Sequence, residues 1–188
     1  MESKKIIIIA GSSGSVNVLL KMLPLVEREH SVPILVVLHR KASDGNMLET
    51  ILQLKSKIKV TEIEDKMPIK NDTIYVAPAN YHVLIENNHE FTLDYSEKVN
   101  FSRPNIDVCM NSLVDVYGSK IIGILLSGAN EDGAEGLKRI SESGGFTIIQ
   151  SPKSCKFPIM PEAAEKLLKP NLKLTPEQIA EFITNLKN

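Results

Sequence analysis

The chain has 188 residues, of which 43% are apolar and 24% are charged, so it can bury one sizeable core but is too short for two ordinary domains. Its 22 lysines and arginines nearly balance its 23 acidic residues, which leaves no general positive field to hold nucleic acid or an anionic membrane surface. We therefore expect a single domain over residues 1–188 that does not bind nucleic acid.

The cysteines and the first residues of the chain bear on its compartment. Cys109 and Cys155 lie far apart, without a CxxC pair or a nearby histidine, which is typical of reduced thiols. The apolar run 6–10 is shorter than the core of a signal peptide and much shorter than a membrane span. These features predict a cytoplasmic protein without direct membrane insertion.

The first third of the chain alternates apolar strands with helical patterns. Residues 6–10 form a β-branched run that is apolar on both faces, typical of a central parallel strand covered by helices. A turn of small residues at 11–15 follows, and apolar residues then recur at helical spacing up to Pro24. The alternation continues with a strand, a helix and a strand, at 33–38, 47–54 and 58–63.

The middle of the chain has a different pattern. Apolar and polar residues alternate in three short segments, 73–77, 82–86 and 90–95, around Asn87-Asn88, and this predicts an antiparallel hairpin region. Asn105 can then cap a helix that carries apolar residues up to Tyr117.

The last third returns to the first pattern. We expect strands at 120–126 and 146–150, a turn at 127–133, and helices at 134–140, 161–168 and 176–186. The complete order predicts an α/β fold: a doubly wound, mainly parallel sheet with helices on both faces, in the manner of Rossmann-like three-layer domains, with an antiparallel hairpin portion.

Side chains that can perform chemistry follow three of the predicted strands. Ligands and reacting groups collect at the carboxyl ends of such strands, where Ser12 with Ser13, His39 and Asp132 occur. Serine needs an imidazole to take its proton and a carboxylate to orient that imidazole, so these residues can supply a nucleophile, a base and an orienting acid. Their order along the chain and the lack of a GxSxG elbow do not fit an ordinary α/β-hydrolase.

Simpler interpretations exist for the same residues. The turn at 11–15 could be a tight connection with a serine helix cap, and Asp132 could merely complement a helix dipole. His82 competes with His39 as the base, but it lies within alternating hairpin sequence, so its position favours a structural role. A dinucleotide site is disfavoured because the first turn lacks GxGxxG.

Several separated motifs match one known family in the same order. They are Gly11-Ser12-Ser13-Gly14, Leu38-His39, Val76-Ala77-Pro78 with His82, Arg103-Pro104-Asn105-Ile106-Asp107, Leu126 to Ala134, Gln150 and Met160-Pro161. With these motifs the chain resembles the catalytic domain of the chemotaxis protein-glutamate methylesterases, the CheB type, up to about residue 168. Residues 169–188 are then a C-terminal helical extension. The chain departs from the family's pattern at Ser15, at Leu38, and at Ala129-Asn130, where the family has Met-Gly.

The resemblance implies a serine hydrolase with Ser12 as nucleophile, His39 as base and Asp132 as the orienting acid. It also implies that Ser13 and the backbone amide of Met160 bind the oxyanion. Neither a cofactor nor a metal is required.

The implied reaction removes methyl esters from glutamyl side chains on the cytoplasmic helices of chemoreceptors, during adaptation in chemotaxis, and the same chemistry would deamidate glutamine. Such a substrate needs an open, shallow cleft. Family members commonly begin with a receiver domain. If this chain is the whole protein, we expect its regulation to come from a separate chain, such as a response regulator, or from expression; removal of a receiver domain from a longer protein is the other interpretation. A catalytically eroded regulatory or binding module of the same fold is the alternative.

Overall fold

The computed structural model describes residues 5–27, 32–40 and 47–186, which form nine strands and six α-helices. The strands are β1 (Ile6–Gly11), β2 (Ile34–Leu38), β3 (Lys59–Glu62), β4 (Thr73–Val76), β5 (His82–Ile85), β6 (Phe91–Asp94), β7 (Ile121–Leu125), β8 (Phe146–Gln150) and β9 (Leu172–Leu174). The helices are α1 (Ser15–Met22), α2 (Met47–Lys55), α3 (Ile106–Tyr117), α4 (Ala134–Glu142), α5 (Ile159–Leu167) and α6 (Pro176–Thr184). Short 3-10 turns are η1 (Leu23–Leu25), η3 (Gly118–Lys120) and η4 (Pro152–Ser154).

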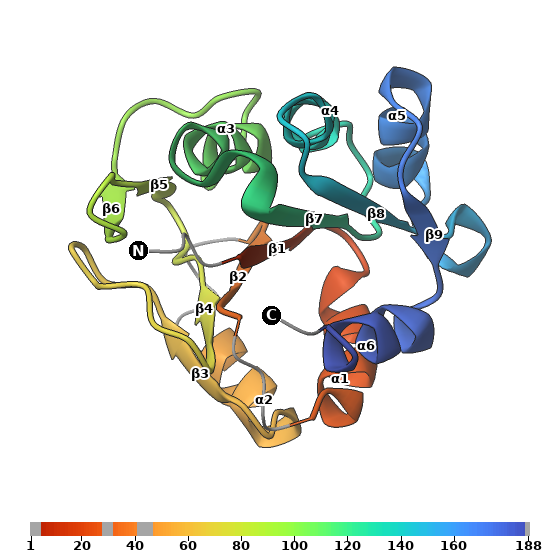
Figure 1. Cartoon of the computed structure of the whole chain (residues 1–188), viewed down its shortest axis with the longest axis horizontal. Coiled ribbons are helices and arrows are strands. Elements are labelled where there is room, and N and C mark those ends of the chain that lie inside the picture. The colour runs from red at the N-terminus through yellow and green to blue at the C-terminus, as the bar shows by residue number, and fades with distance from the viewer. Residues whose placement is uncertain (1–4, 28–31, 41–46, 187–188) are drawn as a thin grey trace.

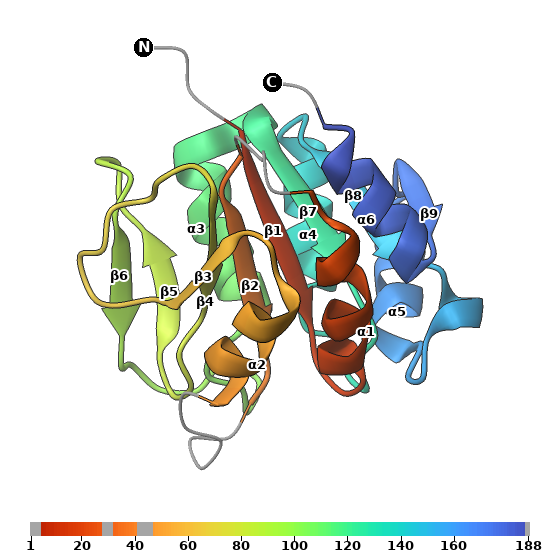
Figure 2. The ribbon, with the colours of Figure 1, turned by 90° about the horizontal axis from the view of Figure 1, so that it is seen from below.

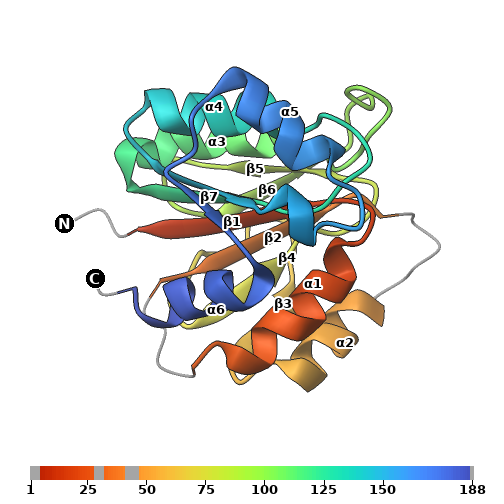
Figure 3. The ribbon, with the colours of Figure 1, turned by 90° about the vertical axis from the view of Figure 1, so that its right-hand side faces the viewer.

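Seven of the strands form one parallel sheet, in the order β3-β4-β2-β1-β7-β8-β9 (Figure 1). β1 lies near its centre, between β2 and β7. The chain leaves β1 toward α1 on one face and leaves β7 toward α4 on the other (Figure 3). The carboxyl ends of β1 and β7 therefore meet at a topological switch point, where α/β sheets bind their ligands.

Each face of the sheet has its own apolar core. Ile6 and Ile8 of β1 pack with α3, α4 and α5, whereas Ile7 and Ile9 pack on the opposite face with α1, α2 and α6. Figure 3 shows these two helical layers above and below the sheet. The two-faced apolar run in the sequence thus corresponds to a strand buried on both sides, and the predicted fold class is confirmed.

The middle of the chain differs in part from the prediction. β5 and β6 do form an antiparallel hairpin, but they make a separate two-stranded sheet that packs against α3 at one end of the molecule (Figure 2). β4, which was assigned to the antiparallel region, instead pairs in parallel with β2 and β3. The alternating pattern was misleading because Tyr75 was counted as polar, although its ring is buried. Its hydroxyl donates to the carbonyl of Pro68 and accepts from the amide of Lys70.

The C-terminal segment is more than the predicted pair of helices. The short strand β9 extends the sheet beside β8, and α6 then returns to cover the α1 face. α6 begins with a capping box, in which the Thr175 hydroxyl accepts from the amide of Gln178 and the Gln178 side chain accepts from the amide of Thr175. Across the described ranges, no helix has the length and apolarity needed to cross a membrane.

Candidate active site

The ends of β1, β2 and β7 bring the three candidate residues to one edge of the sheet. Gly11 pairs with Leu38, so the next residues, Ser12 and His39, leave adjacent strands side by side. The His39 amide donates to the Gly11 carbonyl at 3.2 Å. The Ser12 amide donates to the carbonyl of Ser127, just beyond β7, at 3.0 Å.

His39 and Asp132 are hydrogen-bonded to each other. His39 Nε2 lies 2.6 Å from Asp132 Oδ2, although the residues are 93 positions apart. Their side chains are only 14% and 4% exposed, so the contact is shielded from water. The contact has the geometry expected between a base and its orienting acid, and these two roles stay predictions.

The N-terminus of α3 holds the Asp132 carboxylate. The Ile106 amide donates to Oδ2 at 2.7 Å and the Asp107 amide donates to Oδ1 at 3.0 Å. Burial raises the pKa of Asp132, but the hydrogen bonds from His39 and from these two amides outweigh that effect, so the pKa lies below its usual value. Asp132 therefore stays ionised at neutral pH and can orient an imidazole.

The Ser12 hydroxyl is not bonded to His39. Ser12 is partly exposed, and within the described part of the chain its hydroxyl has no hydrogen-bond partner. Because His39 Nε2 faces Asp132, the ring nitrogen that remains for the serine is Nδ1. In the structure this nitrogen lies 3.2 Å from the side-chain nitrogen of Asn130.

The model of the family described as CheB methylesterase matches residues 7–183. This chain belongs to the CheB methylesterase family. The match continues past residue 168 and includes β9 and nearly all of α6. As a member of this family, the chain is a hydrolase of the methylesterase type.

Relatives and a solved structure agree with the assignment to the CheB methylesterase family. A Leptospira interrogans protein is 41% identical over 96% of this chain and 93% of its own length, and its name gives two activities provisionally, protein-glutamate methylesterase and protein-glutamine glutaminase. An Archaeoglobus fulgidus protein with the same two activities in its name is 32% identical over 94% of this chain, which spans 53% of that protein. The crystal structure of the Thermotoga maritima CheB methylesterase catalytic domain superposes with a TM-score of 0.93 at 29% identity, and covers 98% of this chain and 100% of that domain.

Two departures from the family's motifs have structural explanations. Ser15 is fully buried, and its hydroxyl donates to the Ser127 carbonyl at 2.6 Å, the same oxygen that accepts from the Ser12 amide. Ser15 thus ties the start of α1 to the loop after β7. Leu38 is a buried residue of β2 in the apolar core. Both departures leave the hydrogen bond between His39 and Asp132 intact.

The amide of Met160 is already engaged. It donates to the Gly128 carbonyl at 3.1 Å, and its side chain packs so closely on Gly128 that a Cβ there would lie 2.6 Å from the methionine methyl group. Met160 therefore holds the β7–α4 loop in place at Gly128. The predicted contact of its amide with an oxyanion does not fit this hydrogen bond.

Other backbone amides are available close to Ser12. In the described ranges, the amides of Ser13 and Ala129 have no acceptor within the chain. Ser13 follows the nucleophile position directly, and its carbonyl accepts from the Ser127 hydroxyl at 2.9 Å. Ala129 is two residues beyond Ser127, whose carbonyl binds the Ser12 amide.

His82 has a structural role in the loop that leads to α3. It is buried, its Nδ1 accepts from the Asn105 amide at 3.2 Å, and its Nε2 contacts the Glu97 carbonyl at 3.0 Å. Both ring nitrogens are therefore occupied by backbone groups. Asn105 in turn caps α3, as the sequence predicted, because its side chain accepts from the Val108 amide.

Two further residues of the site were not identified as members from the sequence. Asp107 touches Asp132 and accepts from the Gly136 amide at 2.7 Å, and burial, with the nearby Asp132 charge, raises the pKa of Asp107 to about 6. Asn130 was seen only as a departure from the family's glycine. No sequence signal short of the turn geometry indicated that its side chain contacts His39.

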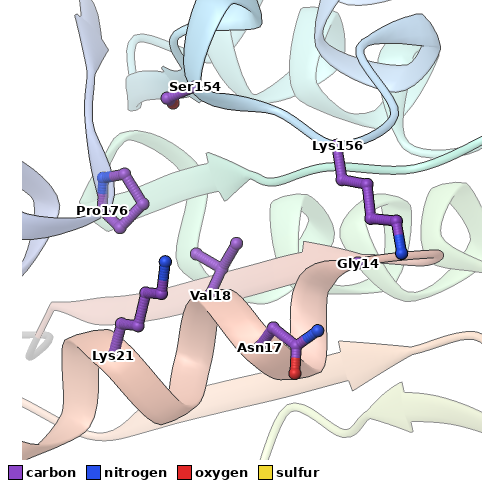
Figure 4. A pocket seen from close by; sticks show the side chains of 7 residues that line it. All are labelled: Gly14, Asn17, Val18, Lys21, Ser154, Lys156 and Pro176. Atoms are coloured by element: carbon purple, nitrogen blue, oxygen red, sulfur yellow. The ribbon is translucent and has the colours of Figure 1, made fainter.

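A groove of about 200 Å³ lies beside the nucleophile turn, between α1 and the segment after β8 (Figure 4). It is lined by Gly14, Asn17, Val18, Lys21, Ser154, Lys156 and Pro176. Figure 4 shows Lys156 reaching toward the turn at Gly14, while Lys21 projects from α1. Gly14, two residues after Ser12, is the lining residue nearest to it in the sequence.

Proposed function

We propose that this protein hydrolyses methyl esters of glutamyl side chains on the cytoplasmic helices of chemoreceptors, with Ser12, His39 and Asp132 as its catalytic triad. The observation that carries the proposal is the buried His39–Asp132 hydrogen bond beside Ser12, in a chain of the CheB methylesterase family. A receptor helix lies in the cytoplasm, which is where we expect the enzyme to act.

The reaction proceeds through an acyl-enzyme. Ser12 Oγ attacks the ester carbonyl while His39 Nδ1 takes the hydroxyl proton, and Asp132 stabilises the resulting imidazolium. The C–O bond to the methoxy group then breaks, and His39 returns the proton so that methanol leaves. A water molecule attacks the acyl-enzyme by the same steps in reverse and releases the glutamate and the Ser12 hydroxyl.

The oxyanion of each tetrahedral intermediate is bound by the amides of Ser13 and Ala129. Neither amide has an acceptor among the residues that the structure describes, which supports this assignment in place of the Met160 amide. Such donors change the rate of acyl transfer by a factor of about 100 to 1,000. With a glutamine substrate the same steps release ammonia, which is the second activity in the names of the relatives.

Methanol release from a methylated receptor preparation tests the triad. Ser12→Ala and His39→Gln should abolish release, and Asp132→Asn should lower turnover by about 10⁴-fold, the loss caused by the corresponding change in serine proteases. Ser141→Ala, in α4, is the matched control and should behave as wild type, with folding checked by circular dichroism.

Two results would contradict the proposal. Absence of methanol release from the wild-type protein would favour the non-catalytic binding module. Loss of release in His82→Gln together with normal release in His39→Gln would show that the base is His82.

A further inference from the structure

Asn130 contacts both His39 and Asp132, the two residues that would activate Ser12. Its Oδ1 accepts from the backbone amide of Asp132 at 3.2 Å, and its Nδ2 lies 3.2 Å from His39 Nδ1. The first contact fixes the orientation of the carboxamide, because only the oxygen can accept from that amide. The group that faces His39 is therefore the NH₂ donor.

The contacts of His39 agree on one arrangement of protons. Asp132 is ionised and only accepts, so His39 Nε2 carries the proton of the 2.6 Å hydrogen bond. A neutral imidazole then has a bare lone pair on Nδ1, and the Asn130 amide donates to it. In the proposed mechanism, this lone pair must take the proton of Ser12.

We infer that Asn130 is a positioning residue that covers the base nitrogen of His39 in the resting site and must release it before Ser12 can react. The inference rests on the triad of the proposed function. The family's pattern has glycine at this position, so a side chain that covers the base is a departure from that pattern. Asn130 is exposed, so its side chain can turn into solvent, and it then gives up its hydrogen bond from the Asp132 amide as well as its contact with His39.

The neighbouring residue suggests how the cover opens. Ala129 offers the amide that we assign to the oxyanion, so a substrate carbonyl bound there enters directly beside Asn130. A net hydrogen-bond contribution of about 0.5–1.5 kcal/mol corresponds to a change of roughly 2- to 12-fold in the population of the uncovered base. We expect loss of the cover to accelerate the reaction of Ser12 within that range.

Two variants separate the two contacts of Asn130. Asn130→Gly restores the family's residue and removes both hydrogen bonds. Asn130→Ser keeps a short acceptor for the Asp132 amide, as in turns closed by serine, but cannot reach His39. Asn88→Gly, at the β5–β6 hairpin tip, is the matched control, because within residues 5–27, 32–40 and 47–186 its side chain hydrogen-bonds to Glu90 alone.

The test uses a small fluorophosphonate, with labelling of Ser12 followed by intact mass, and Ser12→Ala as the blank. Both Asn130 variants should label about 2- to 12-fold faster than wild type, and Asn88→Gly should be unchanged. Nitrogen-15 NMR of His39 should show Nε2 protonated in wild type, and the Nδ1 signal should move in both Asn130 variants.

Different failures have different meanings. Equal or slower labelling in both Asn130 variants, or a wild-type His39 protonated on Nδ1, overturns the inference. Absence of labelling in every variant rejects the proposed triad and the inference with it. Normal labelling with no methanol release from receptors rejects only the substrate.

Discussion

At the scale of single residues, the site contains two adjacent carboxyl groups, Asp132 and Asp107, whose surroundings shift their pKa values in opposite directions. Asp132 receives hydrogen bonds from His39 and from two amides of α3, which keep it charged. Burial, together with the charge of the adjacent Asp132, raises the pKa of Asp107 to about 6, while the pKa of Asp132 is lowered. The protein therefore keeps the charge on the residue that faces the histidine.

From the adjacent carboxyl groups of Asp107 and Asp132 we predict that Asp107→Asn stabilises the protein in a pH-dependent way. The folded-state pKa of Asp107 is raised, so its protonated form favours folding at low pH, and this contribution is lost as the pH rises through about 6. The neutral amide should raise the free energy of unfolding at pH 7.5 by about 1–2 kcal/mol, after allowance for partial exposure, and by almost nothing at pH 3.5.

Urea denaturation at the two pH values measures the effect of Asp107→Asn. Asp115→Asn, an exposed change in the same helix, is the control. An equal gain at both pH values would mean that charge is not the cause.

At the scale of elements, the turn between β1 and α1 is packed with little free space. A Cβ at Gly11 would lie 2.1 Å from the Ser15 hydroxyl and 3.2 Å from Leu126 Cβ. Gly14, just before α1, has a φ of 89°, which a side chain would strain. Ser12 is therefore held between two positions that admit only glycine without rearrangement.

This packing predicts energetic coupling between Gly11 and Ser15. Gly11→Ala should lower the free energy of unfolding by about 1–3 kcal/mol through overpacking. Ser15→Gly removes the hydroxyl that causes the clash, so the double variant should be more stable than the sum of the two single losses implies, by at least about 0.5 kcal/mol. Chemical denaturation of the four proteins gives the coupling energy, and additive losses would contradict it.

Most of the elements could be predicted from their apolar patterns, whereas the triad roles stay predictions. The sequence failed where the hydrogen-bond partner of a polar atom depends on the tertiary structure. Continuous apolar runs identified β1, β2 and β7, and their ends pointed to Ser12, His39 and Asp132. β4 was misassigned because Tyr75 counts as polar in an alternating pattern, although its ring is buried. The partners of Asn130 and of the Met160 amide depend on turn geometry, which residue spacing does not report.

At the scale of the whole molecule, the C-terminal segment completes the domain. Ile179, Ala180 and Ile183 of α6 are buried in the core that contains Ile7 and Ile9 of β1. α6 packs against α1, the helix that follows the nucleophile turn. The last helix of the chain thus supports α1 and, through it, the turn that contains Ser12.

A core substitution in α6 should therefore behave like one in the centre of the sheet. Ile179→Ala should lower the free energy of unfolding by about 2–5 kcal/mol. Glu181→Ala, exposed on the same helix, should change it by less than about 0.5 kcal/mol. Thermal or urea unfolding compares them, and a small loss for Ile179→Ala would show that α6 is only loosely attached.

The central position of β1 also matters while the chain is being synthesised. β2 follows β1 from the ribosome within 40 residues, but β7 begins only at Ile121. Until then, one edge of a strand with four consecutive isoleucines has unpaired backbone groups, and such edges join neighbouring chains readily. We therefore expect this edge of β1 to be open to pairing with other chains until β7 has left the ribosome and paired with β1.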